Sequence, residues 1–209
     1  MRRFISFEGI EGSGKTTQIQ MFSNHLEERG VEHVLTREPG GTPLGDQIRR
    51  MVLDPRNIAM TSTCELLLYA AARAQHIEEV IRPALERGEF VLSDRFTDAT
   101  MAYQGFGRGL PMEPIRRIHE LEVLALVPDM TLLFDIDAAT ALERARHRDH
   151  TRFVDETRFE QEDLAFHERV RAGYLDLSRR DSGRIVVIDA RGRPDDVHAR
   201  VLAAVKRLL

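Results

Sequence analysis

The sequence predicts an α/β fold in which a five-stranded parallel sheet is flanked by helices. Five short apolar runs, each of the kind that forms a buried strand, are spread along the chain. Longer segments lie between them and carry apolar residues three and four positions apart, as on one face of a helix. Strands that alternate with helices in this way favour a parallel sheet whose two faces are both covered.

Large apolar and β-branched residues dominate the expected strands. Two of these strands follow glycine-containing turns, in the stretches ERGEF at 86–90 and DSGRI at 181–185, which also end the preceding helices. The expected strands are Phe4–Phe7, Val31–Leu35, Phe90–Leu92, Thr131–Phe134 and Ile185–Ile188.

The expected helices are identified by their apolar spacing. The second of them is preceded by Ser62 and Glu65, which have the spacing of a capping box. The expected helices are Ile19–Leu26, Leu66–Leu85, Ile115–Leu126, Leu164–Leu177 and Val197–Leu208.

Length and composition predict one domain, residues 1–209, with a lid at about 144–158. Hydrophobic residues make up 42% of the chain, which is enough for a core. A net charge of −4 argues against generic nucleic-acid binding, and no apolar run approaches the roughly 18 residues of a membrane span. The single cysteine, Cys64, excludes an internal disulfide and is expected to pack as a small apolar residue. We therefore expect a cytoplasmic protein that binds neither nucleic acid nor membrane.

A phosphate-binding loop follows the first expected strand. The stretch GIEGSGKT at 9–16 matches the pattern G-x-x-x-x-G-K-[ST] at every fixed position, between a strand and a helix. Its glycines allow successive backbone N–H groups to face an anion, Lys15 can reach the β- and γ-phosphates, and the Thr16 hydroxyl can bind Mg²⁺. The chain is thus predicted to have a P-loop NTPase fold. The predicted ATP-binding residues are Gly9, Ile10, Glu11, Gly12, Ser13, Gly14, Lys15, Thr16 and Thr17.

A carboxylate at the end of another strand completes the predicted metal site. Asp94 follows an apolar run and is well placed to hold Mg²⁺ together with Thr16. Asp135 ends a different strand and is the alternative, with a turn or capping role as its simpler explanation. We favour Asp94 because Arg95 follows it and can clamp a phosphate with two hydrogen bonds.

An arginine-rich stretch at 144–158 is predicted to close over the phosphates as a lid. Guanidinium groups in such a lid would neutralise the transferring phosphoryl group and exclude water. A solvated helix face is the simpler interpretation, and it suffices for Arg144. The arginines of the stretch are Arg144, Arg146, Arg148, Arg152 and Arg158. The predicted catalytic residues are Lys15, Arg95, Arg148 and Arg152.

Five motifs in order resemble the bacterial thymidylate kinases, and together they cover nearly the whole chain. They are FEGIEGSGKTTQ at 7–18, TREPGGTPLGDQIR at 36–49, LLLYAAARAQH at 66–76, SDRFTDATMAYQGFGRGL at 93–110 and RFEQEDLAFHERVRAGYLDL at 158–177. The fourth is the most specific, because other nucleoside monophosphate kinases do not carry it. The resemblance implies the reaction of ATP with dTMP to give ADP and dTDP, with Mg²⁺, by a homodimer.

The resemblance also implies the residues that hold dTMP. Glu11 matches the family's contact to the sugar 3′-hydroxyl, and Arg95 the arginine that holds the dTMP phosphate. Tyr69 and Arg73 lie four residues apart, which places them on one face of a helix, to stack on the thymine ring and to hydrogen-bond it. Thr100 is expected to replace a serine that the family often carries at position 99. The implied dTMP-binding residues are Glu11, Arg37, Tyr69, Arg73, Arg95, Thr100, Tyr103 and Gln104.

Three other functions are compatible with a P-loop. A kinase for CMP, UMP or AMP is disfavoured by the stretch AYQGFGRG, and a GTPase by the absence of an N-K-x-D guanine motif from the sequence. A non-catalytic nucleotide-binding module would not need Lys15, Thr16, Asp94 and Arg95 together with an arginine-rich stretch. A turnover assay separates it from an enzyme.

Overall fold

The structure, a computed structural model, describes residues 3–146, 157–160, 162–206 and 208. A five-stranded sheet with the order β2-β3-β1-β4-β5 forms its centre, and all neighbouring strands are parallel. The strands are β1 Phe4–Glu8, β2 His33–Arg37, β3 Phe90–Asp94, β4 Met130–Asp135 and β5 Ile185–Asp189. The predicted parallel sheet and its five strands are confirmed, although β2 begins two residues later than expected.

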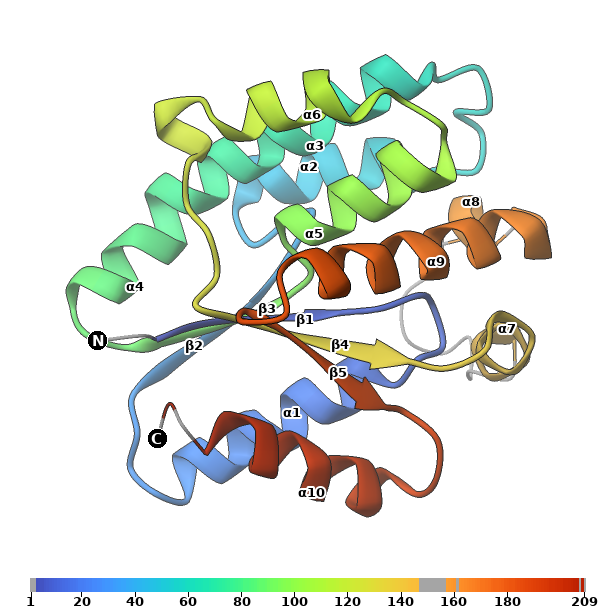
Figure 1. Cartoon of the computed structure of the whole chain (residues 1–209). Coiled ribbons are helices and arrows are strands. Elements are labelled where there is room, and N and C mark those ends of the chain that lie inside the picture. Colours follow the sequence, from blue (N-terminus) through green and yellow to red (C-terminus); the bar gives the residue numbers. More distant parts are fainter. Residues whose placement is uncertain (1–2, 147–156, 161, 207, 209) are drawn as a thin grey trace.

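Helices cover both faces of the sheet (Figure 1). α1 and α10 lie on one face, and the helices from α2 to α6 lie with α9 on the other. The α-helices are α1 Lys15–Glu27, α2 Pro43–Leu53, α3 Ser62–His76, α4 Arg82–Glu86, α5 Thr97–Thr100, α6 Met112–His119, α7 Ala138–Arg146, α8 Thr157–Glu160, α9 Leu164–Arg180 and α10 Pro194–Val205. Two π-helical segments, η1 Ile77–Ile81 and η2 Met101–Gly107, and a 3₁₀ turn, η3 Glu122–Leu124, complete the described elements.

The central strand β1 is buried along its whole length. Phe7 packs with Phe22 of α1 and stacks on Phe134 of β4, with ring centroids 5.9 Å apart. Phe4 belongs to a separate apolar cluster and packs edge-on against Phe96 at 4.9 Å. Because packing fixes β1 from both sides, the loop that follows it starts from a rigid support.

α3, η1 and α4 form one continuous helical run, as the sequence predicted for 66–85. Pro83 has no N–H to donate within that run. Just before it the hydrogen bonds change from the α-helical to the π-helical spacing, since the Arg82 N–H donates to the Ile77 carbonyl five residues back. The predicted capping box is wrong, because Thr61, not Ser62, accepts the hydrogen bond from the Cys64 N–H. Cys64 itself is exposed in the first turn of α3, so its expected burial is also wrong.

The helix expected at 115–126 ends earlier, at His119, and is followed by η3. The chain has to leave the helix to reach β4, and its path is fixed just before that strand. There the carboxylate of Asp129 accepts hydrogen bonds from the backbone N–H groups of Arg3 and Phe4, at 2.9 and 3.0 Å. None of the helices in the described part of the chain is long and apolar enough to cross a membrane.

Candidate active site

The loop after β1 has the shape of an anion-binding site. Gly9 and Gly12 have φ values of 141° and 74°, and a Cβ on either would lie closer than 3.0 Å to a backbone oxygen, of Phe134 or Ala141. Only glycine fits both positions. α1 begins directly after Gly14, which has no side chain to cap it, and no acidic residue lies in its first turn. The first N–H groups of α1 are therefore available to a phosphate.

Lys15 folds back over this loop. Its Nζ donates to the carbonyl oxygens of Gly9 and Ile10 at 3.0 and 2.9 Å, and to the Ser13 hydroxyl at 3.4 Å. Burial, and next the positive charge of Arg95, lower the pKa of Lys15 to about 8. A phosphate oxygen would replace these neutral acceptors with an anion and stabilise the charged form of the ammonium.

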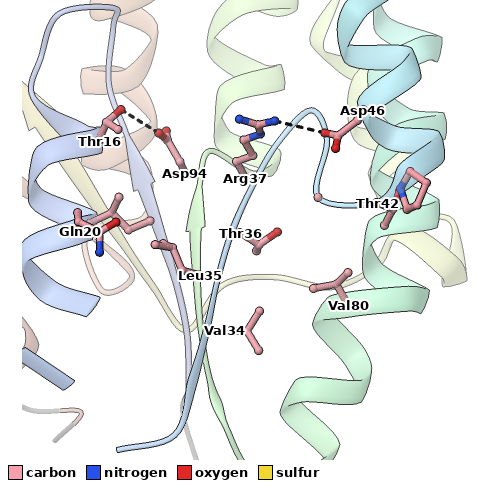
Figure 2. Close-up of a pocket in the computed structure, with 13 residues that line it drawn as sticks. Thr16, Gln20, Val34, Leu35, Thr36, Arg37, Thr42, Asp46, Val80 and Asp94 are labelled. Carbon is pink, nitrogen blue, oxygen red and sulfur yellow. Dashed lines mark hydrogen bonds and ion pairs between the residues drawn. The ribbon is translucent and has the colours of Figure 1, made fainter. Parts of the chain in front are cut away.

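Thr16 and Asp94 meet at the edge of a surface pocket (Figure 2). The Thr16 hydroxyl donates to Asp94 Oδ2 at 3.3 Å, from α1 to the end of β3. A hydroxyl and a carboxylate are hard oxygen donors, and Mg²⁺ in nucleotide sites is usually held by one or two such groups together with the phosphates. The two residues thus fit the predicted magnesium site.

The alternative ligand, Asp135, is engaged elsewhere. Arg171 of α9 donates to both of its carboxylate oxygens, at 2.7 and 2.9 Å. A carboxylate held by a bidentate arginine has little capacity left for a cation. This pairing favours Asp94 over Asp135 as the metal ligand.

Arg95 lies in the turn after β3 and is held on several sides. Its φ is 73°, and it is the only non-glycine residue in the described ranges with φ in the left-handed region. Nη1 donates to the Gly9 carbonyl at 3.0 Å and to the Tyr174 hydroxyl at 3.2 Å. Nη2 donates to Glu11 at 2.6 Å and to the Tyr103 hydroxyl at 3.2 Å, with the guanidinium above the Tyr103 ring. These contacts stabilise a backbone conformation that costs about 1–2 kcal/mol.

Glu11 is tied to the same group of residues. The Tyr103 hydroxyl donates to its second oxygen at 2.5 Å. Burial raises the pKa of Glu11, but the charges of Arg95 and Lys15 and the bond from Tyr103 outweigh it and lower the pKa to about 2. Three residues predicted from the sequence, Glu11, Arg95 and Tyr103, thus form one bonded cluster beside the P-loop, with Glu11 ionised at neutral pH.

Arg73 is almost wholly buried, with 1% of its surface exposed, and it is paired within the protein. Its Nε donates to Glu38 at 2.7 Å, and its Nη2 donates to the Thr100 hydroxyl and the Phe96 carbonyl at 2.9 and 3.2 Å. Nη1 lies 3.1 Å from Nε2 of His119, whose pKa is lowered to about 3 by burial and by Arg73, so the neutral imidazole accepts. An arginine has five N–H groups, and one of those on Nη1 donates to no residue in the described part of the chain, so it is available to a ligand.

Gln104 is positioned by a buried carboxylate on α3. Its Nε2 donates at 2.8 Å to Glu65, which also accepts from Arg108 at 3.3 Å and from Arg158 at 2.5 Å. Glu65 therefore binds one buried and one partly buried arginine instead of capping α3. Tyr69 lies one helical turn further along α3 and is half-buried. Burial, and next the charge of Glu65, raise the pKa of Tyr69, so its hydroxyl is neutral.

The remaining predicted residues are more dispersed. Arg37 is half-exposed and faces Asp46 at 3.5 Å across the pocket of Figure 2, which has a volume of about 600 Å³. Of the predicted dTMP residues, all of which the structure describes, only Arg37 lines that pocket. Arg148 and Arg152 lie outside the described residues. Arg158, at the end of the predicted lid stretch, is buried and bonded to Glu65.

Two members of the Arg95 cluster were not predicted. Glu8, the last residue of β1, accepts a hydrogen bond from Tyr174 of α9, and Tyr174 in turn accepts from Arg95. Both lie inside motifs that carry the family resemblance, yet local spacing does not connect residues 166 positions apart. A glutamate as the last residue of a buried strand was the one available signal.

A parallel sheet with a P-loop after its central strand, and with a lysine and an arginine converging on that loop, defines a P-loop nucleotide-binding protein. Comparisons with known proteins specify which one. The family model of thymidylate kinase matches residues 7–201. The chain belongs to the thymidylate kinase family, and the sequence-based resemblance is confirmed.

Similar proteins match over nearly their whole length. The chain is 51% identical over 208 residues to a thymidylate kinase of Desulforapulum autotrophicum, with 99% of this chain and 92% of the relative covered. It is 52% identical over 202 residues to that of Syntrophotalea carbinolica, covering 96% and 94%. A crystal structure of thymidylate kinase from Ehrlichia chaffeensis aligns with a TM-score of 0.79 at 34% identity, covering 98% of each chain.

Proposed function

We propose that this protein transfers the terminal phosphoryl group of ATP to dTMP, giving ADP and dTDP. Family membership sets the reaction class. The observation that carries the proposal further is that Lys15 Nζ and Arg95 Nη1 both lie 3.0 Å from the Gly9 carbonyl oxygen, approaching it from α1 and from the turn after β3. Two cations thus meet where the phosphates of donor and acceptor would be brought together.

In the proposed mechanism the protein supplies no nucleophile, because a phosphate oxygen of dTMP attacks the terminal phosphorus of ATP. The P-loop N–H groups and Lys15 hold the ATP phosphates, and Arg95 holds the acceptor phosphate in line with them. Mg²⁺ at Thr16 and Asp94 would neutralise further phosphate charge. Glu11, ionised and fixed by Arg95 and Tyr103, is available to accept a hydrogen bond from the sugar hydroxyl, and Arg73 to donate its remaining N–H to the base.

The test of this function is ADP formation with ATP and Mg²⁺, with dTMP, dUMP, CMP, UMP, AMP and GMP offered one at a time. We expect fast turnover with dTMP and slower turnover with dUMP, because one methyl group in an apolar pocket contributes only about 1–3 kcal/mol. Turnover with CMP or AMP but not with dTMP would assign the protein to another substrate. Inactivity with all six would contradict the kinase assignment.

Replacing Asp94 with asparagine should raise the Mg²⁺ concentration needed for half-maximal rate by at least about tenfold, because a neutral amide is a much weaker magnesium ligand. The matched control is Asp135→Asn, which removes the carboxylate that ends β4, on the far side of β1, and that Arg171 already engages. It should leave the Mg²⁺ requirement unchanged. Equal shifts in both variants would contradict Asp94 as the specific ligand.

We further propose a cytoplasmic homodimer, as the family resemblance implies. Four exposed apolar side chains on α3 and in the segment after α6 support a buried partner surface. They are Leu67, Leu121, Val123 and Val127. Light scattering on the purified protein should give twice the chain mass of 23.9 kDa, and Leu121→Glu should lower that mass if these residues form the interface.

A further inference from the structure

Glu8 is a buried carboxylate at the end of β1, with 0% of its surface exposed. It makes no direct ion pair with any residue in the described ranges. Two successive hydrogen bonds, through the Tyr174 hydroxyl, connect it to Arg95. A lone ionisable group in a protein core is unfavourable unless its hydrogen bonds are satisfied. Its position therefore calls for a role beyond packing.

Each carboxylate oxygen of Glu8 accepts a hydrogen bond from a group that is linked to Arg95. Oε1 accepts the backbone N–H of Phe96, the residue directly after Arg95, at 2.7 Å. Oε2 accepts the Tyr174 hydroxyl, also at 2.7 Å, and that hydroxyl accepts from Arg95 Nη1 at 3.2 Å. Glu8 thus fixes the backbone directly after Arg95, which has a left-handed conformation. Through the Tyr174 hydroxyl it also fixes the Arg95 guanidinium.

We propose that Glu8 is a positioning residue for phosphoryl transfer, which fixes Arg95 toward the P-loop by binding the Phe96 N–H and orienting the Tyr174 hydroxyl. This inference rests on the proposed function, in which Arg95 holds the acceptor phosphate. It assigns no substrate contact to Glu8, because Glu8 is fully buried and acts through its two partners.

The protonation state of Glu8 changes how well this arrangement is held. As a carboxylate it accepts from Tyr174, so that Tyr174 can accept from Arg95. As a neutral acid it would donate to the Tyr174 oxygen, which then receives two donors and leaves its own hydrogen without this acceptor. The ionised form therefore aligns Arg95 better.

Burial, and next the charge of Asp98, raise the pKa of Glu8 to about 8, against the opposing effects of Arg95 and the bonds from Tyr174 and Phe96. The charged and titratable groups facing Glu8 are Asp98 of α5, Arg95 after β3, Tyr174 of α9 and Lys15 of α1. Because the folded protein binds this proton more tightly than the unfolded chain, Glu8 contributes less stability as the pH rises from about 4.5 to about 8. Alignment of Arg95 should improve over the upper part of that range.

The test is Glu8→Gln, which keeps the size and the acceptor for the Phe96 N–H but turns a donor toward Tyr174. At saturating MgATP and dTMP, we expect its kcat to be about tenfold below the unmodified protein at pH 9 and close to it at pH 6.5. Glu8→Gln also removes a charge that raises the pKa of Lys15. Saturating MgATP places phosphate oxygens against the Lys15 ammonium and keeps it charged in both proteins, so its titration contributes little to the kcat ratio. The Tm at pH 9 should stay equal or rise, because a buried charge has been removed.

Two further variants separate positioning from general packing. Tyr174→Phe removes the bridge, and adding Glu8→Gln to it should cost little more, whereas two independent effects would multiply. Ser6→Ala is the matched control, since Ser6 is equally buried on β1 but bonds to Thr131, at 2.9 Å, on the neighbouring strand. The ratio of the kcat of Ser6→Ala to that of the unmodified protein should be the same at every pH.

A Glu8→Gln protein whose kcat follows that of the unmodified protein at every pH would overturn this inference alone. So would a loss that is equal at all pH values and accompanied by a lower Tm, because that is what a packing role predicts. An unmodified protein that does not phosphorylate dTMP would instead overturn the proposed function, and this inference with it.

Discussion

Replacing Arg95 with alanine is expected to lower kcat for dTMP phosphorylation by about 10²–10³-fold, the usual loss when one donor that stabilises transition-state charge is removed. The Arg95 guanidinium donates to the Gly9 carbonyl at 3.0 Å, beside Lys15. No other cation in the described residues is bonded at that position, so none stands in for the charge that the variant lacks. Steady-state kinetics with saturating ATP and varied dTMP measures the loss. Near-normal turnover would contradict the role of Arg95 as the phosphate clamp.

The left-handed backbone of Arg95 provides a sharp companion variant. Arg95→Gly removes the same guanidinium but accepts a φ of 73° without a Cβ clash, whereas alanine keeps the clash. We expect the two variants to have the same kcat, with the glycine variant about 1 kcal/mol more stable, a Tm difference of about 2–4 °C. Arg117→Ala, which breaks only an exposed pair with Glu113, should leave kcat unchanged.

The fold and the P-loop could be predicted because their signals are local. A strand, a glycine-rich loop and a helix follow one another within the first 27 residues, and each carries its own pattern of apolar or glycine residues. Asp94 could be predicted from its position at a strand end. In the structure, Asp94 lies within hydrogen-bond distance of Thr16 because β3 is next to β1 in the sheet.

The supporting residues could not be predicted, because their partners are distant in the sequence. Glu65 has the spacing of a capping residue, yet it accepts from Arg108 and Arg158, 43 and 93 residues away. Glu8 has the appearance of a strand end until Tyr174 meets it. The sequence around a carboxylate indicates only its local roles, such as capping a helix. Its pairing with residues far away in the sequence is set by how the elements pack together.

Arg73→Ala is expected to destabilise the protein as well as raise the KM for dTMP. Removing Arg73 leaves Glu38 buried, with His76 Nδ1 at 3.0 Å as its remaining partner. An uncompensated buried charge costs about 3–5 kcal/mol, which corresponds to a fall in Tm of roughly 6–20 °C in a chain of this length. Thermal unfolding monitored by circular dichroism measures the fall, and an unchanged Tm would contradict the importance of this pair.

The double variant Arg73→Met with Glu38→Gln separates the two effects of Arg73. It removes both charges at similar volume, and replacing a whole buried pair is often neutral or stabilising. We therefore expect the double variant to recover most of the Tm while its KM for dTMP stays high, because the one N–H of Arg73 left for the base is still missing. If the KM recovered together with the Tm, Arg73 would act on dTMP only by supporting the fold around Thr100 and Phe96, and the base contact would have to come from another residue.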